Sequence, residues 1–236
     1  MHNVKRNFAQ KVDEINLFYK LIYNIEKLEG KFIFTNDTNR IERIDVITNS
    51  ILKSTCYLVL YNLVESTITD CLTKIHNEFS EANLLFEDLS DEIKIIWIRY
   101  HYDYFHKASQ DDKFLHNLKL LIESWVLNHT PIKLTYEDYI KYNTGSNFAG
   151  NLDSKEIRKL CDLYGIDFDI SCKQIRTIRD NRNKLAHGED SFSERGRIIT
   201  YEYVENLKSE TISYLENFIN AIEDYITHTK FKKQNS

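Results

Sequence analysis

The chain has 236 residues, 42% of them hydrophobic, so it can bury a substantial core as one large or two small domains. It contains only 6 Gly and 1 Pro, which disfavours a sheet protein, because sheets need turn residues roughly every 10 positions. No apolar run approaches the roughly 18 residues of a membrane span, and no signal-peptide core follows the first residues. We therefore expect a soluble, cytoplasmic, helical protein with no membrane partner.

Apolar residues recur at helical spacing along the N-terminal half of the chain. This pattern predicts a helix, a connector, and then one long helix or two in line, at Val4–Leu28, 32–38 and Ile41–Phe79. Residues 56–68 are apolar nearly all round, which indicates a buried central helix with Asn62 and Glu65 embedded in it. Within a single domain spanning residues 1–236, we expect residues 1–40 to form an N-terminal helical extension.

The C-terminal half continues the helical pattern after an irregular stretch. Five helices are predicted, at Asp88–Phe105, Asp111–Leu127, Lys155–Tyr164, Ser171–Ala186 and Tyr201–Tyr225. Residues 130–150 hold the only Pro and a close Gly pair, so they are expected to form an irregular insertion. Asn151-Leu152-Asp153 offers carboxylate and amide groups that can cap the helix that follows, and Gly165 is placed to end it.

The cysteines and histidines show no metal-binding pattern. The four cysteines form no CxxC pair and lie in segments that read as helical, so we expect reduced, packed thiols. His101, Asp103 and His106 lack the i, i+4 spacing that lets one helical face hold zinc. The sequence therefore predicts neither a metal site nor a cofactor.

One segment is strongly basic although the whole chain carries a net charge of −5. Between Lys173 and Lys184 lie five positive side chains and one negative, a local charge of +4 that leaves −9 on the rest of the chain. Long-range attraction of nucleic acid by the whole molecule is therefore not expected, and any polyanion site must be local.

On a helical wheel, this basic segment separates an apolar stripe from a polar one. The apolar stripe consists of Ile175, Ile178 and Leu185, and the neighbouring stripe holds Arg176, Arg179, Asn183 and His187. Arg182 lies at the edge of the apolar stripe. His187 occupies the last turn before Gly188, where the end of the helix favours its protonated form.

These side chains match what phosphodiester cleavage without a metal requires. A histidine can move the proton of the attacking or leaving oxygen, and arginines can hold the phosphate and offset its developing charge. No acidic cluster suited to magnesium accompanies the segment, which argues against a two-metal nuclease. RNA is the natural substrate, because its 2′-hydroxyl supplies an internal nucleophile.

The run Arg182-Asn183-Lys184-Leu185-Ala186-His187 resembles the R-x4-6-H motif of the HEPN (higher eukaryotes and prokaryotes nucleotide-binding) superfamily. The flanking residues are similar to those of its small stand-alone bacterial ribonucleases in defence and toxin systems. They are Ile178-Arg179-Asp180, Gly188, Ser191-Phe192, Gly196-Arg197, Gly150-Asn151-Leu152-Asp153 and Leu60-Tyr61-Asn62-Leu63-Val64-Glu65. The resemblance implies an all-α HEPN-like helical bundle with long central and C-terminal helices.

It also implies a homodimeric, metal-independent endoribonuclease, acting as a toxin or anti-phage effector and controlled by an antitoxin or sensor protein. By position, Arg182 stabilises the phosphate, His187 performs acid/base work and Asn183 orients either group. Arg182 and His187 lie about 140° apart around a regular helix, so a two-fold axis could bring them together from two subunits. The supporting residues are expected to be Arg176, Arg179 and Lys184 at phosphates, with Asp180 and Glu65 behind them.

Other interpretations of the same residues remain open. The chain could be a catalytically inactive HEPN module that binds RNA or nucleotide, or a non-enzymatic interaction subunit, because a fold can outlive its chemistry. Arg176 and Arg179 also fit an ordinary solvated helix face, and Glu65 fits a buried, paired structural carboxylate.

Overall fold

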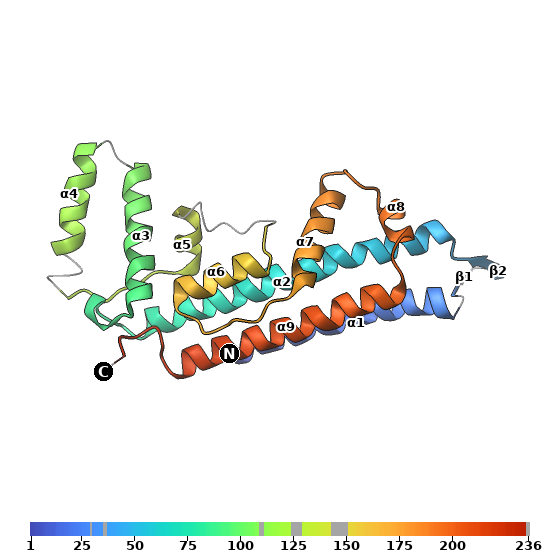
Figure 1. Cartoon of the computed structure of the whole chain (residues 1–236), viewed down its shortest axis with the longest axis horizontal. Coiled ribbons are helices and arrows are strands. Elements are labelled where there is room, and N and C mark those ends of the chain that lie inside the picture. The colour runs from blue at the N-terminus through green and yellow to red at the C-terminus, as the bar shows by residue number, and fades with distance from the viewer. Residues whose placement is uncertain (29, 35–36, 109–110, 124–128, 143–150, 235–236) are drawn as a thin grey trace.

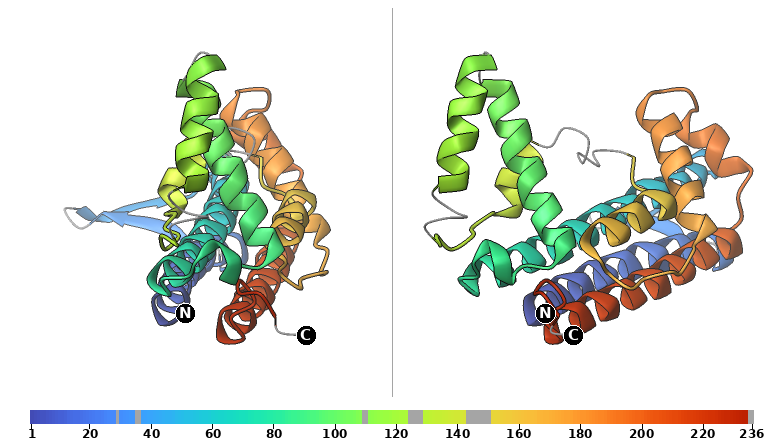
Figure 2. Two further views of the ribbon diagram at one scale, coloured as in Figure 1. Left: turned by 90° about the vertical axis from the view of Figure 1, so that its left-hand side faces the viewer. Right: turned by 60° about the vertical axis from the view of Figure 1, so that its left-hand side comes forward.

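The computed structural model describes residues 1–28, 30–34, 37–108, 111–123, 129–142 and 151–234. Three long helices run along the long axis of the molecule: α1 (His2–Lys27), α2 (Val46–Glu81) and α9 (Tyr201–Thr227) (Figure 1). The turned views show these three helices packed side by side as one bundle (Figure 2). The predicted helical fold with long central and C-terminal helices is confirmed.

Helix α2 is the centre of the core. It is one unbroken helix of 36 residues, and Asp45 caps its start by accepting the Thr48 N–H at 2.7 Å. Its inward side chains are fully buried, among them Cys56, Leu60, Tyr61, Val64, Leu72 and Ile75. The prediction of a buried central helix is therefore confirmed, except that Asn62 lies on its exposed side.

Helix α1 is part of this core. Its Ile15, Tyr19 and Ile22 are almost completely buried, and it packs against both α2 and α9. The description of residues 1–40 as an extension is therefore wrong for α1, because the bundle would lose one of its three long helices without it.

The stretch between α1 and α2 is an antiparallel hairpin rather than the predicted connector. Strands β1 (Lys31–Phe34) and β2 (Asp37–Arg43) pair with Ile33 opposite Ile41. Phe32, Ile33 and Phe34 have high strand propensity, which the helical periodicity did not register. As a result, α2 begins at Val46, five residues later than expected.

A group of shorter elements covers one end of the bundle (Figure 1). They are η1 (Phe86–Asp88), α3 (Asp91–Ala108), α4 (Asp111–Leu121), α5 (Tyr136–Tyr142) and α6 (Ser154–Tyr164). Helix α5 corrects the expectation of an irregular insertion over 130–150, of which residues 143–150 lie outside the described part. Buried His76 of α2 ties this end together, contacting the Leu134 carbonyl at 2.8 Å and the Tyr164 hydroxyl at 2.7 Å.

Helix α7 (Lys173–Ala186) rises from the bundle beside the short helix α8 (Phe192–Arg197) (Figure 1). Gly196 of α8 lies directly against α2, since a Cβ atom there would approach the Ser50 carbonyl oxygen to 1.7 Å. This close approach fixes the position of α8, and through it the loop that follows α7.

All four cysteines are buried free thiols. Within the described ranges, no group of three or more His, Cys, Asp or Glu side chains could hold a metal ion. Every helix in the described part of the chain is too short or too polar to cross a membrane.

Candidate functional site

Helix α7 presents the basic segment, and its orientation follows from three apolar side chains. Ile175, Ile178 and Leu185 are buried against the bundle, as the helical wheel predicted. The helix ends at Gly188, whose φ of +72° favours glycine, and the Glu189 amide then donates to the Lys184 carbonyl at 2.9 Å. His187 is the last residue before this turn, and its side chain is exposed.

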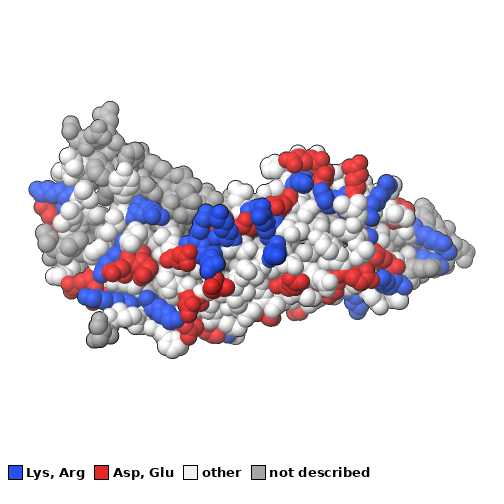
Figure 3. All heavy atoms as spheres, viewed as in Figure 1, with Lys and Arg blue, Asp and Glu red and all other residues white. Residues whose placement is uncertain are grey.

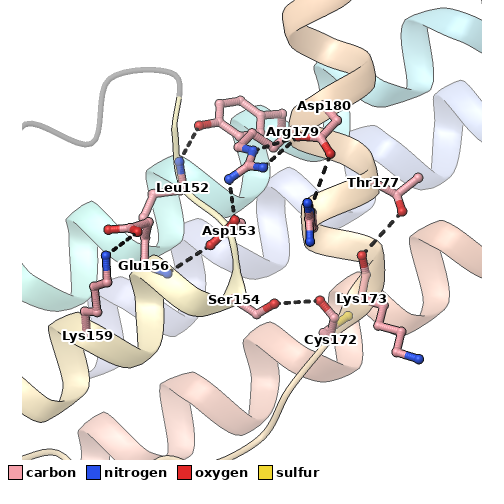
Figure 4. A network of polar contacts seen from close by, with 12 residues as sticks. Leu152, Asp153, Ser154, Glu156, Lys159, Cys172, Lys173, Thr177, Arg179 and Asp180 are labelled. Atoms are coloured by element: carbon pink, nitrogen blue, oxygen red, sulfur yellow. Dashed lines mark hydrogen bonds and ion pairs between the residues drawn. The ribbon is translucent and has the colours of Figure 1, made fainter.

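Arg179 is engaged by two carboxylates. Its Nε and Nη2 donate to Asp180 at 3.0 and 2.7 Å, and its Nη1 donates to Asp153. Figure 4 shows Arg179 and Asp153 pointing toward each other between α6 and α7. Burial lowers the pKa of Arg179, but Asp180 and Asp153 outweigh this effect and raise it. These contacts support a structural role for Arg179 in place of the phosphate contact that we expected.

Asp153 has two functions in this network. Its carboxylate caps α6 by accepting the Glu156 N–H at 2.9 Å, and it also binds Arg179 of α7. One buried side chain therefore starts one helix and fixes the next. The sequence indicated the cap but gave no sign of the ion pair, because the partner lies 26 residues away.

Arg182 has a different environment. Its guanidinium lies 4.8 Å from the centre of the Tyr61 ring, and its Nη1 donates to the Asn183 side chain at 3.0 Å. No carboxylate in the described part of the chain lies within ion-pair distance of it. Arg182 is therefore a half-buried cation that stacks on an aromatic ring and forms no ion pair with a described carboxylate.

Tyr61 was noted in the sequence as part of the central helix, but its contact with Arg182 was not predicted. It is fully buried in α2, and its hydroxyl accepts the Leu152 N–H at 2.9 Å. Burial raises the pKa of this hydroxyl, and the charge of nearby half-buried Glu65 raises it further. From the sequence, an aromatic residue in an apolar helix is predicted to be a core residue. Only the three-dimensional structure shows that one face of the Tyr61 ring supports Arg182.

The two motif side chains do not contact each other within one chain. The His187 side chain makes no hydrogen bond or ion pair with any described residue, while Arg182 faces α2. Lys184 is exposed, and Arg176 is 73% exposed with its Nε 3.7 Å from Asp180, which is a weak surface pair. The structure thus places all the predicted site residues on α7 or at its C-terminal end except Glu65, which lies on α2. It brings Arg182 into contact with Asn183, and Arg179 and Arg176 into contact with Asp180, but it does not bring Arg182 to His187.

One comparison with known proteins gives a match. The family model described as HEPN_MAE_28990-like HEPN matches residues 2–231, which is nearly the whole chain. No curated protein and no solved structure matches the chain significantly.

Proposed function

Because the chain belongs to the HEPN_MAE_28990-like HEPN family, we propose that it is a metal-independent endoribonuclease with Arg182, Asn183 and His187 in its active site. Its resemblance to stand-alone bacterial HEPN ribonucleases supports a role in a toxin or anti-phage system. An antitoxin or sensor protein would then restrain it.

The main structural support for this proposal is that Arg182 is half-buried and has no carboxylate partner among the described residues. A half-buried cation is normally paired, because leaving its charge unneutralised away from water is costly. Arg179, three residues earlier, has two carboxylates, whereas Arg182 has an aromatic ring and an amide. A phosphate is the partner that this arrangement accommodates, since guanidinium groups bind phosphate oxygens with two parallel hydrogen bonds.

The chemistry then follows from the two motif side chains. The RNA 2′-oxygen attacks the adjacent phosphorus and loses its proton, and the bond to the 5′-oxygen breaks as that oxygen gains a proton. His187 moves one of these protons, since an imidazole can both accept and donate a proton and this one is exposed to solvent. Arg182 offsets the negative charge that builds on the phosphate oxygens.

A dimer gives these two groups a common site. Arg182 and His187 are five residues apart, about 140° around the helix, so they diverge within one subunit. A two-fold axis beside α7 would bring Arg182 of one subunit to His187 of the other. The side chain of His187 is available for this, since it projects from the end of α7 into solvent.

The test is RNA cleavage by the purified protein in the presence of a chelator. We expect cleavage to survive chelation and to be lost in Arg182→Ala and in His187→Ala. Arg99→Ala and His116→Ala are matched controls, because both side chains are exposed on helices α3 and α4, away from the motif. RNA binding without cleavage would instead support an inactive binding module, and cleavage that persists in both motif variants would refute the proposed site.

A further inference from the structure

A solvent-open cleft lies between the start of α6 and the first half of α7. It has a volume of about 660 Å³ and is lined by Asp153, Ser154, Lys155, Glu156, Ser171, Lys173, Arg176, Thr177 and Arg179. Figure 4 shows this region, with Ser154 and Asp153 on one wall and Thr177 and Arg179 on the other. Neither Arg182 nor His187 lines it, so it is separate from the proposed catalytic residues.

The two carboxylates that line this cleft, Asp153 and Glu156, are already paired with other groups of the protein. Asp153 is bound by Arg179 and by the first turn of α6. Glu156 accepts the Lys159 ammonium at 2.7 Å. Both carboxylates are thus neutralised by partners that the fold supplies.

In contrast, three basic side chains of the cleft, Lys155, Lys173 and Arg176, are not held in strong ion pairs. Lys155 and Lys173 are exposed, come from different helices, and form no ion pair with any described residue. Arg176 adds a third cation that is only loosely paired with Asp180. In the space-filling view, Lys and Arg gather over α6 and the adjoining part of α7 (Figure 3). The cleft therefore has an excess of available positive charge.

The lining also indicates which anion would fit. Hydroxyl groups of Ser154, Ser171 and Thr177 supplement the cations, as is common where proteins contact phosphates. None of the described residues that line the cleft is aromatic, so they offer no surface on which a base could stack. This combination favours the backbone phosphates of a polynucleotide over a free nucleotide.

The position of the cleft relative to His187 fits a strand that runs along α7. Arg176 and His187 are 11 residues apart, which places them about 20° apart around the helix and about 16 Å apart along it. A bound strand could therefore reach both points on the same face of one helix.

We propose that this cleft binds backbone phosphates of the RNA substrate several nucleotides away from the bond that is cut. The inference rests on the proposed ribonuclease function and extends its binding surface to α6. Lys155 and Lys173 contribute to affinity through charge, independently of base sequence, and take no part in the chemical step.

The test measures binding of a 2′-O-methyl RNA oligonucleotide, which cannot be cut because it lacks the nucleophile. The dissociation constant is measured at several salt concentrations for the wild type and for the double variant Lys155→Ala/Lys173→Ala. We expect weaker binding and a salt slope smaller by roughly 1.4, from about 0.7 per lost phosphate contact on a single strand. The value of kcat at saturating RNA should be unchanged.

Lys20→Ala/Lys133→Ala is the matched control, because it removes the same charge from two exposed lysines elsewhere. If the cleft variant binds with the affinity and salt slope of this control, the inference is wrong. That result, together with loss of cleavage in Arg182→Ala and His187→Ala, would overturn the cleft alone. A wild type that binds no RNA would overturn both the cleft and the proposed function.

Discussion

Asp153 both caps α6 and binds Arg179 of α7, so the loss of folding stability when it is replaced can be estimated from the structure. Asp153→Ala removes an N-cap, worth about 1 kcal/mol, and a charge-assisted hydrogen bond to Arg179, worth about 1.5–3 kcal/mol. Both side chains are largely sheltered, with exposed fractions of 10% for Asp153 and 20% for Arg179, so solvent screening is limited. Arg179 keeps Asp180, which places the expected total near 3 kcal/mol.

Asp153→Asn separates the two contributions. Asparagine is as good an N-cap as aspartate, so this variant should lose only the charge interaction, about 2 kcal/mol. Urea unfolding and thermal melts measure both variants, and a loss of 3 kcal/mol corresponds to a melting temperature lower by about 6–12 °C in a chain of this size.

Asp169→Ala is the control for these measurements, because Asp169 pairs with Arg158 at an exposed site, where such pairs contribute about 0–1 kcal/mol. If Asp153→Ala costs no more than Asp169→Ala, Asp153 does not hold α6 against α7. Equal losses for Asp153→Ala and Asp153→Asn would contradict the capping contribution.

Three further predictions concern packing, pH and the Arg182 platform. Gly196→Ala should cost about 3 kcal/mol or more in urea unfolding, because its Cβ would lie 1.7 Å from the Ser50 carbonyl oxygen; a near-neutral effect would mean that α8 does not touch α2. Burial lowers the pKa of His76 and His101 to about 4, so the unfolded chain binds protons below about pH 6.5 that the folded chain does not. Stability should therefore fall from pH 6.5 toward 4, by about 1.4 kcal/mol per pH unit for each histidine, and equal stability at pH 7 and 5 would refute this. Only phenylalanine keeps a ring beneath Arg182, so kcat/KM for RNA should be about 5- to 30-fold lower in Tyr61→Leu than in Tyr61→Phe. Equal values in the two variants would mean that the Tyr61 ring does not support Arg182.

The long helices could be predicted because each one buries a single continuous stripe. Ile15, Tyr19 and Ile22 of α1 recur at three- and four-residue spacing, and all of them lie in the core. The hairpin escaped prediction because its strands are short and are flanked by two strongly periodic helices. Asn62 was misplaced because an apolar helix still has one face outside the core, and composition alone does not say which face that is.

The candidate site shows more clearly which features local sequence patterns predict and which depend on long-range contacts. A helical wheel puts Arg179 in the polar stripe of α7 and Arg182 at the edge of the apolar stripe, but it does not show which of the two has a carboxylate partner. What separates them is a partner from a distant part of the chain, Asp153 for Arg179 and Tyr61 for Arg182. Local spacing predicted the helix that carries both arginines, but only long-range contacts show that Arg179 is paired with carboxylates and that Arg182 is not.

The most direct test of the proposed function is complementation between two inactive subunits. Arg182→Ala and His187→Ala chains, differently tagged and co-expressed, are isolated as mixed dimers and assayed on RNA with a chelator present. Such a dimer retains one intact pair, Arg182 from one subunit and His187 from the other, so we predict about half the wild-type activity per dimer. Mixed dimers as inactive as either parent would contradict a site shared between two subunits.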